Sequence, residues 1–123
     1  MIVGIGIDAV DVARMRTVLA RTPSFAARVF SAAELEYAHR RRDPTEPLAA
    51  RFAAKEAVLK AMGLGLGHCA MTDIEVGRDD EGVPAVVLHG PAIVLAADRA
   101  ITTWHLSLTH TETVAMAVAL AER

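Results

Sequence analysis

Two carboxylates follow the apolar segment that opens the chain. Residues 2–7 are apolar and mostly β-branched, which predicts a buried strand, and Asp8 comes directly after them, with Asp11 three positions further on. Carboxylates at a strand end are natural ligands for Mg²⁺, which prefers oxygen and keeps several waters. Both aspartates would also serve as N-terminal caps of the next helix. Spacing alone favours the caps, and Asp8 is the better ligand candidate because an acid is expected in a first helical turn.

A second charged pair lies in the helix that the sequence predicts over residues 47–62. Glu56 and Lys60 are four positions apart, so they share a helix face, and we expect Phe52 and Leu59 on that same face. The pair is either an exposed salt bridge or a functional pair, because charged groups on an apolar face usually have a task there. The spacing leaves these two interpretations equal.

Polar residues alternate along a strand predicted near the end of the chain. His105, Ser107 and Thr109 share one strand face, while Leu106 takes the other. A face of this kind can bind phosphate, although a plain solvated face is commoner. His110 has the opposite parity and is expected in the turn. No serine, histidine and aspartate form a recognisable nucleophilic triad.

Arginines recur every seven residues in the first quarter of the chain. Arg14, Arg21 and Arg28 follow this spacing, but Pro23 prevents one continuous helix from aligning all three. They form either a solvated basic surface or a docking surface for an acidic helix. The run Arg40–Arg42 closes a predicted helix, where cations complement the helix dipole.

The elements that must position these residues alternate between helices and strands. Ser31 and Glu34 form a capping box, and the glycines of 63–67 form a loop without the Lys-Ser/Thr ending of a P-loop. One strand, several helices and then strand pairs are typical of an α+β fold with helices packed on an antiparallel sheet. We expect helices over about 11–21, 32–42, 47–62 and 91–99, a hairpin of strands over 73–77 and 83–89, and closing strands over 103–109 and 113–120.

Composition narrows the class of protein further. A chain of 123 residues argues for one domain over 1–123. Apolar residues make up 53% and aromatic residues only 4%, so the core is small and some apolar surface is expected to be buried against other copies. The single Cys69 excludes a disulfide framework, and we assign it and Trp104 to packing. No apolar run approaches the roughly 18 residues of a membrane span, and no signal peptide is recognisable, so a cytoplasmic protein is expected.

Charge is unevenly distributed along the chain. The net charge is −2, but residues 1–71 carry a basic excess and residues 72–123 an acidic one. A basic stretch in an acidic protein indicates an acidic protein partner or phosphates rather than duplex nucleic acid. Scarce aromatic residues also argue against a nucleic-acid binder that uses Arg40–Arg42.

Three motifs together resemble one known family. They are Gly4-Ile5-Gly6-Ile7-Asp8, the segment Arg51-Phe52-Ala53-Ala54-Lys55-Glu56-Ala57 continuing to Lys60-Ala61, and His105-Leu106-Ser107-Leu108-Thr109-His110. In this order and near this spacing they are similar to holo-[acyl-carrier-protein] synthase, the small single-domain type of 4′-phosphopantetheinyl transferase. The resemblance covers essentially the whole chain. Asp11 stands where the family commonly has Glu, and its shorter reach weakens any metal or partner role there.

The resemblance implies a reaction and an assembly. Family members move the phosphopantetheine arm of coenzyme A to a serine of an apo acyl carrier protein of fatty-acid or polyketide synthesis. They use Mg²⁺, release adenosine 3′,5′-bisphosphate, and form trimers with active sites at subunit interfaces. Phosphoryl transfer needs charge neutralisation and alignment more than an enzyme nucleophile, which agrees with the absent triad.

The resemblance also implies roles for individual residues. Asp8 and Glu56 would be the metal ligands, Lys60 would contact the pyrophosphate, and Glu56 is the candidate base for the serine proton. The other implied sites are Arg51, Gly63, His105 and Ser107 for coenzyme A and Arg14 with Arg21 for the carrier protein.

The alternative from another class is a non-catalytic trimeric module that binds coenzyme A or a carrier protein. The presence of Asp8, Glu56 and Lys60 together argues against it, since a mere binder needs no metal ligands.

Overall fold

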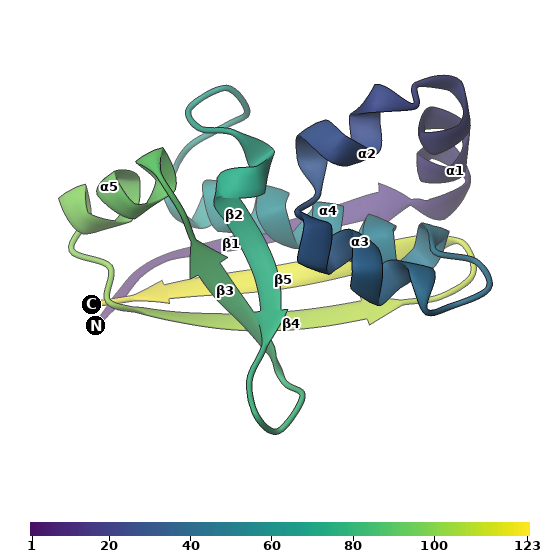
Figure 1. The fold of residues 1–123 in the computed structure, drawn as a ribbon. Helices are drawn as coiled ribbons and strands as arrows, with labels where there is room; N and C mark the ends of the chain where they lie inside the picture. Colours follow the sequence, from purple (N-terminus) through teal and green to yellow (C-terminus); the bar gives the residue numbers. More distant parts are fainter.

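The computed structural model describes residues 1–123 as an α+β fold, as expected. A three-stranded antiparallel sheet runs in the order β1-β5-β4, and β2 pairs with β3 in a separate hairpin (Figure 1). The strands are β1 (Ile2–Asp11), β2 (Ile74–Arg78), β3 (Pro84–Leu88), β4 (Thr103–His110) and β5 (Val114–Glu122). The helices are α1 (Val12–Arg21), α2 (Ser24–Val29), α3 (Ala32–His39), α4 (Thr45–Ala61) and α5 (Pro91–Asp98), with a 3-10 turn over Met71–Asp73.

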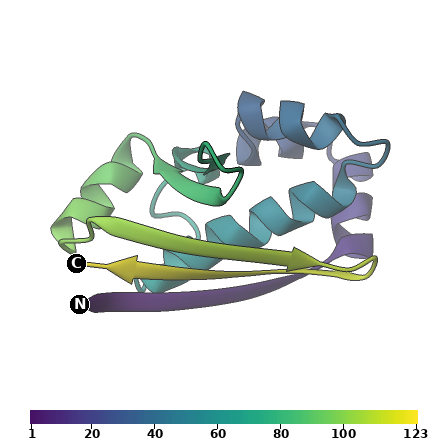
Figure 2. The ribbon, with the colours of Figure 1, turned by 90° about the horizontal axis from the view of Figure 1, so that it is seen from below.

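The three-stranded sheet is covered on one face only. Figure 2 shows α4 lying along the sheet, with the other helices and the β2–β3 hairpin on the same side. Alternate residues of β5 face α4, and the alanines at 115, 117, 119 and 121 are fully buried there. The opposite face carries large apolar side chains in the open, with Ile5 65% and Ile7 55% exposed. An apolar face of this kind in a small protein usually marks an interaction surface.

Helix α4 is the centre of the fold, and it differs from the helix that the sequence predicted. We expected one apolar stripe through residues 47–62, but α4 is buried on almost all sides, including Arg51 and Lys55. Alanine is what permits this burial, because small side chains allow the sheet, α1 and α3 to pack closely around one helix. Phe52 and Glu56 are partly buried on the side that faces α1 and β1.

Two glycines bring β1 into direct backbone contact with α4. A Cβ at Gly4 would lie 1.9 Å from the Ala61 carbonyl oxygen, and one at Gly6 would lie 1.9 Å from that of Ala57. No side chain fits in this space. Gly4, Gly6 and Asp8 therefore form one row of β1 that faces the C-terminal half of α4.

A buried ion pair fastens α3 and β2 to α4. The Lys55 ammonium lies 2.7 Å from Glu34 Oε1 and donates to the carbonyl oxygens of Met71 and Ile74. Glu34 accepts from the Val76 amide as well and completes the capping box with Ser31. The capping box was expected from the sequence, whereas Lys55 was not assigned a role.

Several element boundaries differ from the prediction. The first strand extends to Asp11, because its ladder with β5 continues to the Asp11–Val114 pair, so Asp8 lies inside the strand and not at its end. The helix expected over 32–42 ends at His39, and the short helix α2 was not expected. The strand pairs and α1 lie close to their predicted ranges. None of the helices combines the length and the apolar character that a membrane span requires.

Candidate functional site

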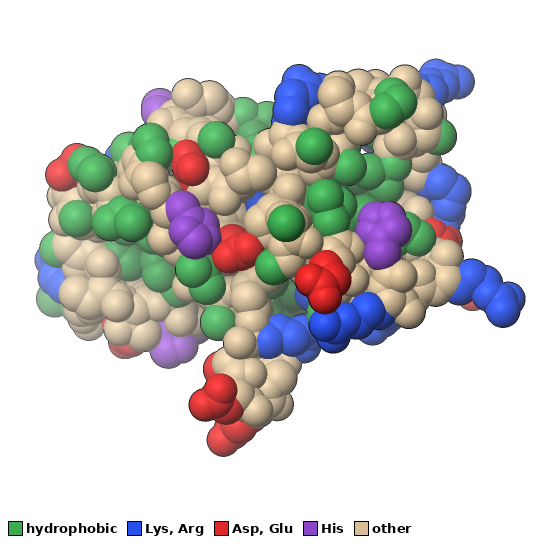
Figure 3. All heavy atoms as spheres, viewed as in Figure 1, with side chains coloured by type: hydrophobic (Ala, Val, Ile, Leu, Met, Phe, Trp, Pro, Cys, Tyr) green, Lys and Arg blue, Asp and Glu red, His purple; other side chains and the backbone are tan.

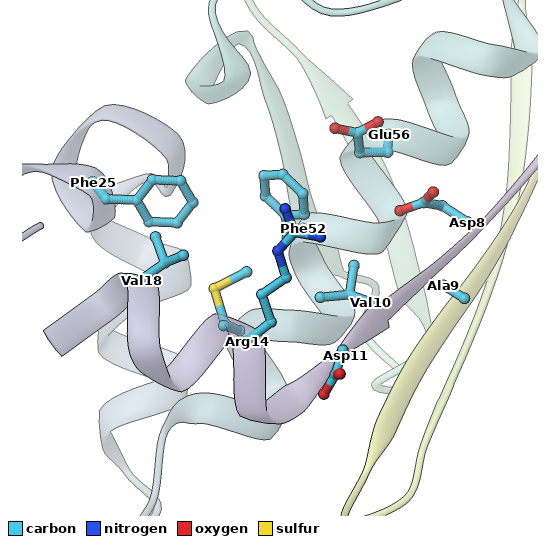
Figure 4. A pocket seen from close by; sticks show the side chains of 10 residues that line it. Asp8, Ala9, Val10, Asp11, Arg14, Val18, Phe25, Phe52 and Glu56 are labelled. Carbon is cyan, nitrogen blue, oxygen red and sulfur yellow. The ribbon is translucent and has the colours of Figure 1, made fainter. Parts of the chain in front are cut away.

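Three charged side chains meet where β1 crosses the end of α4. The Lys60 ammonium donates to Asp8 Oδ1 at 3.2 Å and to the Ile7 carbonyl oxygen at 3.1 Å. Glu56, one turn before Lys60, forms no salt bridge with it. Figure 4 shows the Glu56 and Asp8 carboxylates beside each other at one end of a pocket. The pair is thus not an exposed i,i+4 bridge but part of a cluster of two carboxylates and one ammonium.

The electrostatics of Glu56 follow from this placement. Partial burial raises the pKa of Glu56, and the neighbouring Asp8 carboxylate raises it further, against a smaller opposing effect of Lys60. No group of three or more acidic, histidine or cysteine side chains is gathered as a complete metal centre. Two carboxylates do fit Mg²⁺, which is commonly held by one or two carboxylates while waters and substrate phosphates complete its coordination.

The pocket beside these carboxylates has a volume of about 490 Å³. Its walls come from β1, α1, α2 and α4, and its apolar lining comprises Ala9, Val10, Met15, Val18, Phe25 and Phe52. A pocket with apolar walls and a few convergent polar groups is the usual form of a ligand site. Phe25 escaped the sequence analysis because α2 was not expected.

Asp11 is a helix cap. Its Oδ1 accepts a hydrogen bond from the Ala13 amide at 3.0 Å, which satisfies one free donor at the start of α1. In Figure 4 its side chain points away from Asp8 and Glu56. The two interpretations of the aspartates therefore divide between them, with Asp11 the cap and Asp8 the member of the charged cluster.

Arg14 lies in the same pocket and enters from α1 (Figure 4). Arg21 is the last residue of α1 and is exposed. The seven-residue spacing places it on the same face of α1 as Arg14. Arg28 lies in α2, so the break at Pro23 separates it from the other two, as predicted.

Arg51 lies apart from the carboxylates, beside β4. It is 3% exposed, and its Nη1 donates to the Pro47 carbonyl oxygen at 3.1 Å. Burial lowers the pKa of Arg51. It lines a second cavity of about 230 Å³, here termed the arginine basin, whose polar lining comprises Tyr37, Arg41, Arg51, Arg78 and His110. The basin shares no residue with the pocket at Asp8.

The expected alternation of β4 is confirmed. His105, Ser107 and Thr109 are exposed on the open face of the sheet, and His105 Nε2 lies 3.0 Å from Glu122 Oε1. Asp8 faces α4, so one chain does not bring His105 or Ser107 to the Asp8 cluster. The expectation that His110 lies in the turn was wrong, because β4 continues to His110, whose Nδ1 lies 3.8 Å from Glu46.

Gly63 ends α4 beside Lys60. Its φ of +72° is in the left-handed region that favours glycine, and its amide donates to the Lys60 carbonyl oxygen. A side chain there would meet nothing within 4 Å. The Arg99 guanidinium donates to the Met62 carbonyl oxygen, and both Arg99 and Gly63 line a shallow hollow with Lys60.

Known proteins of one family match this chain over nearly its whole length. A model of the 4′-phosphopantetheinyl transferase superfamily matches residues 4–119. A holo-[acyl-carrier-protein] synthase of Moorella thermoacetica is 46% identical over 117 residues, which cover 95% of this chain and 91% of that protein. The crystal structure of holo-[acyl-carrier-protein] synthase from Neisseria meningitidis superposes with a TM-score of 0.89 at 33% identity and full coverage of both chains. That of a Bacillus anthracis holo-(acyl-carrier-protein) synthase in complex with CoA (3′,5′-ADP) superposes with a TM-score of 0.81 at 35% identity, covering 98% of this chain and 96% of that one.

Proposed function

The chain belongs to the 4′-phosphopantetheinyl transferase superfamily, and from this membership we propose that it is the enzyme that converts apo acyl carrier protein to the holo form. It transfers the 4′-phosphopantetheine arm of coenzyme A to a serine of the carrier protein and releases adenosine 3′,5′-bisphosphate. The observation that carries this function to the residues is the cluster of Asp8, Glu56 and Lys60, whose two carboxylates line one end of a partly apolar pocket. That cluster has the charges that a pyrophosphate and a divalent cation require.

Asp8 and Glu56 are the residues that would hold Mg²⁺. Their carboxylates come from different elements, and neither is needed as a helix cap. When bound there, the ion supplies positive charge that stabilises negative charge on the transferring phosphate. Lys60 would stabilise the same negative charge on the phosphate from the other side of Asp8. Its side chain is half exposed there, so the ammonium can reach a phosphate oxygen.

The reaction needs a base and not an enzyme nucleophile. The serine hydroxyl of the carrier protein attacks the phosphorus next to pantetheine, the bond to adenosine 3′,5′-bisphosphate breaks, and the serine proton must leave. Glu56 borders the pocket and is the candidate that accepts this proton, directly or through a water. A Glu56→Gln variant tests the role: if its rate falls only in proportion to its Mg²⁺ affinity, Glu56 is a ligand and not the base.

The placement of the remaining residues supports a trimer with sites between subunits. Asp8 lies at the β1 edge of the sheet, Arg51 lies beside the β4 edge, and His105 lies on the open face. A ring of copies brings different surfaces of neighbouring subunits together. Coenzyme A would then contact Lys60 and Gly63 of one subunit, beside the metal that Asp8 and Glu56 would hold, and the nucleotide-binding residues Arg51, His105 and Ser107 of the next.

The open face of the sheet is the surface that such a trimer would bury. One row of side chains across the sheet runs from Ile5 on β1 through Leu120 on β5 to His105 on β4. The next row runs from Ile7 through Val118 to Ser107. Apolar rows that end in polar residues fit an interface whose rim contributes to a site. Arg14 and Arg21 remain on the outer side, on α1, where they would meet acidic side chains of the carrier protein.

Intact-mass spectrometry of an apo acyl carrier protein is the direct test. The carrier is incubated with this protein, coenzyme A and Mg²⁺, beside a control with a chelator. We expect a mass gain of one phosphopantetheine that the chelator abolishes. No gain with several apo carriers, from a folded protein that binds coenzyme A, would support the non-catalytic binding module instead. A gain that survives the chelator would remove the metal from the proposal and keep the transferase.

A further inference from the structure

Tyr37 makes a contact that the proposed function leaves unexplained. Its ring receives two guanidinium groups: the Cζ of Arg51 lies 4.2 Å from the ring centroid and that of Arg78 lies 4.5 Å from it. Arg78 also donates from Nη2 to the Tyr37 hydroxyl and from Nη1 to the Gly82 carbonyl oxygen, both at 2.6 Å. The ring therefore joins α3, α4 and the β2–β3 hairpin around the arginine basin.

The charges that line the arginine basin are unbalanced, although Glu36 and Glu75 lie in a neighbouring hollow that Tyr37, Arg51 and Arg78 also line. Arg41, Arg51 and Arg78 all line the basin, and no carboxylate does. Figure 3 shows Lys and Arg side chains gathered where α3 and the loop after it meet the hairpin. Guanidinium groups held together repel each other unless an anion or an electron-rich surface compensates. The Tyr37 ring face supplies part of this compensation.

The Arg51 guanidinium is held in place, but not all of its N–H donors have a hydrogen-bond acceptor. Its Nη1 is bound to a backbone carbonyl, whereas its buried Nε has no hydrogen-bond partner in the protein. A carboxylate partner would fix the guanidinium but would also occupy the donors that a phosphate needs. An aromatic face fixes the guanidinium plane and leaves its edge free to donate.

We propose that Tyr37 is a positioning residue for the binding of coenzyme A. The Tyr37 ring holds the Arg51 guanidinium in the orientation that binds a phosphate group of the nucleotide. This inference rests on the proposed function, in which Arg51 contacts coenzyme A. Arg78 fixes the Tyr37 ring in turn, because its guanidinium is hydrogen-bonded both to the phenol hydroxyl and to the Gly82 carbonyl oxygen.

Steady-state kinetics with three variants tests the role. Tyr37→Leu removes the ring and should raise KM for coenzyme A roughly 5- to 30-fold, with kcat and KM for the carrier protein within about twofold of the parent. Tyr37→Phe keeps the ring face and should restore most of the affinity. In an Arg51→Gln background, Tyr37→Leu should add almost nothing, because both changes act through one guanidinium.

The outcomes separate this inference from the function on which it rests. If the parent enzyme transfers phosphopantetheine and Tyr37→Leu leaves KM for coenzyme A unchanged, only the positioning role is overturned. Equal rises of both KM values, or effects that add to those of Arg51→Gln, overturn it too, because they indicate a general structural role. If Tyr37→Leu does not fold, Tyr37→Met takes its place, since it fills a similar length without an aromatic face. Failure of the parent to modify any apo carrier would be a failure of the proposed function itself.

Discussion

Lys60 contacts Asp8 at 3.2 Å, across the boundary between α4 and β1, and leaves Glu56 on its own helix without a salt bridge. Two residues 52 positions apart in the sequence are thus closer partners than the i,i+4 pair that the sequence displays. The cluster consequently depends on how β1 lies against α4. Its charges sum to −1 when all three groups are ionised, which suits a bound cation better than an isolated surface pair would.

Asp8 and Asp11 provide a matched pair of variants. We expect Asp8→Ala to lower the transfer rate on the order of 10²-fold or more, because it removes a group proposed to hold the metal at the reacting phosphate. Coenzyme A binding and the folded structure should persist. Asp11→Ala should keep the rate and lower the free energy of unfolding by about 0.5–2 kcal/mol, as expected for a lost N-cap. Intact-mass time courses measure the transfer rates of both variants, and unfolding curves measure their stability. Equal losses of rate would contradict the division of roles between Asp8 as metal ligand and Asp11 as helix cap.

Arg14 should matter to one substrate only. Reversing it to Glu places a negative charge in the pocket wall next to Phe52, where an acidic carrier protein would be repelled. We expect KM for the carrier protein to rise on the order of tenfold while KM for coenzyme A changes little. Arg16→Glu is the control, since it makes the same charge change on α1 where Arg16 pairs with Asp43 at 2.8 Å. Equal changes of both KM values for Arg14→Glu would exclude it from the docking surface.

His105 tests the assignment of the open face. If it holds a charged phosphate, His105→Ala should weaken coenzyme A binding by about 1–3 kcal/mol, measured by calorimetry. His89 is the control, because it is also a half-exposed histidine beside a carboxylate, 3.1 Å from Glu75, but lies in the loop between β3 and α5. An unchanged affinity in His105→Ala would return this strand face to a solvated or purely interfacial role.

The sequence predicted the helices and strands better than it predicted how deeply each of them is buried. Alternation marked the two faces of β4, and turn residues marked the β2–β3 hairpin, because both patterns depend on neighbouring residues. The burial of α4 on almost all sides could not be predicted from such patterns, since an alanine-rich helix shows no sharp apolar stripe. The ion pair between Lys55 and Glu34 was missed for a related reason, although Glu34 was predicted in the capping box, because a buried ion pair depends on contacts between residues far apart in the sequence.

The candidate site was predicted in its residue types but not in its geometry. Local spacing left the Glu56–Lys60 pair undecided and gave Asp8 and Asp11 two possible roles each. The structure separates these roles through the register of β1, which turns Asp8 toward α4 and leaves Asp11 to cap α1. Tyr37 had no signal in the sequence, because its partners Arg51 and Arg78 come from other elements.

The contact between Gly6 and α4 should be intolerant of any side chain. A Cβ there would lie 1.9 Å from the Ala57 carbonyl oxygen, so Gly6→Ala must push β1 away from the helix. We expect a loss of at least about 1–3 kcal/mol in the free energy of unfolding, together with lower activity, because Asp8 moves with the strand. Gly65→Ala is the control, since its Cβ would meet nothing within 4 Å. A stable and active Gly6→Ala variant would contradict the close packing of β1 on α4.

The pH dependence of stability should depend on Ser31. Its hydroxyl donates to Glu75, and this hydrogen bond, with a further one from His89, holds the pKa of Glu75 below its ordinary value of 4.5 despite partial burial. A carboxyl with a lower pKa in the folded state stabilises the fold above its unfolded pKa. That contribution is lost as the pH falls through the folded pKa.

Ser31→Ala should therefore destabilise most at neutral pH. We expect a cost of about 1–2 kcal/mol at pH 7, which includes the lost cap of α3, and a smaller cost in strongly acidic solution, where Glu75 is protonated in both proteins. Urea unfolding at several pH values measures the difference. In a Glu75→Gln background the cost of Ser31→Ala should no longer vary with pH, because only the cap remains. A cost that is independent of pH in the parent background would mean that the hydroxyl stabilises the helix end alone and contributes nothing through Glu75.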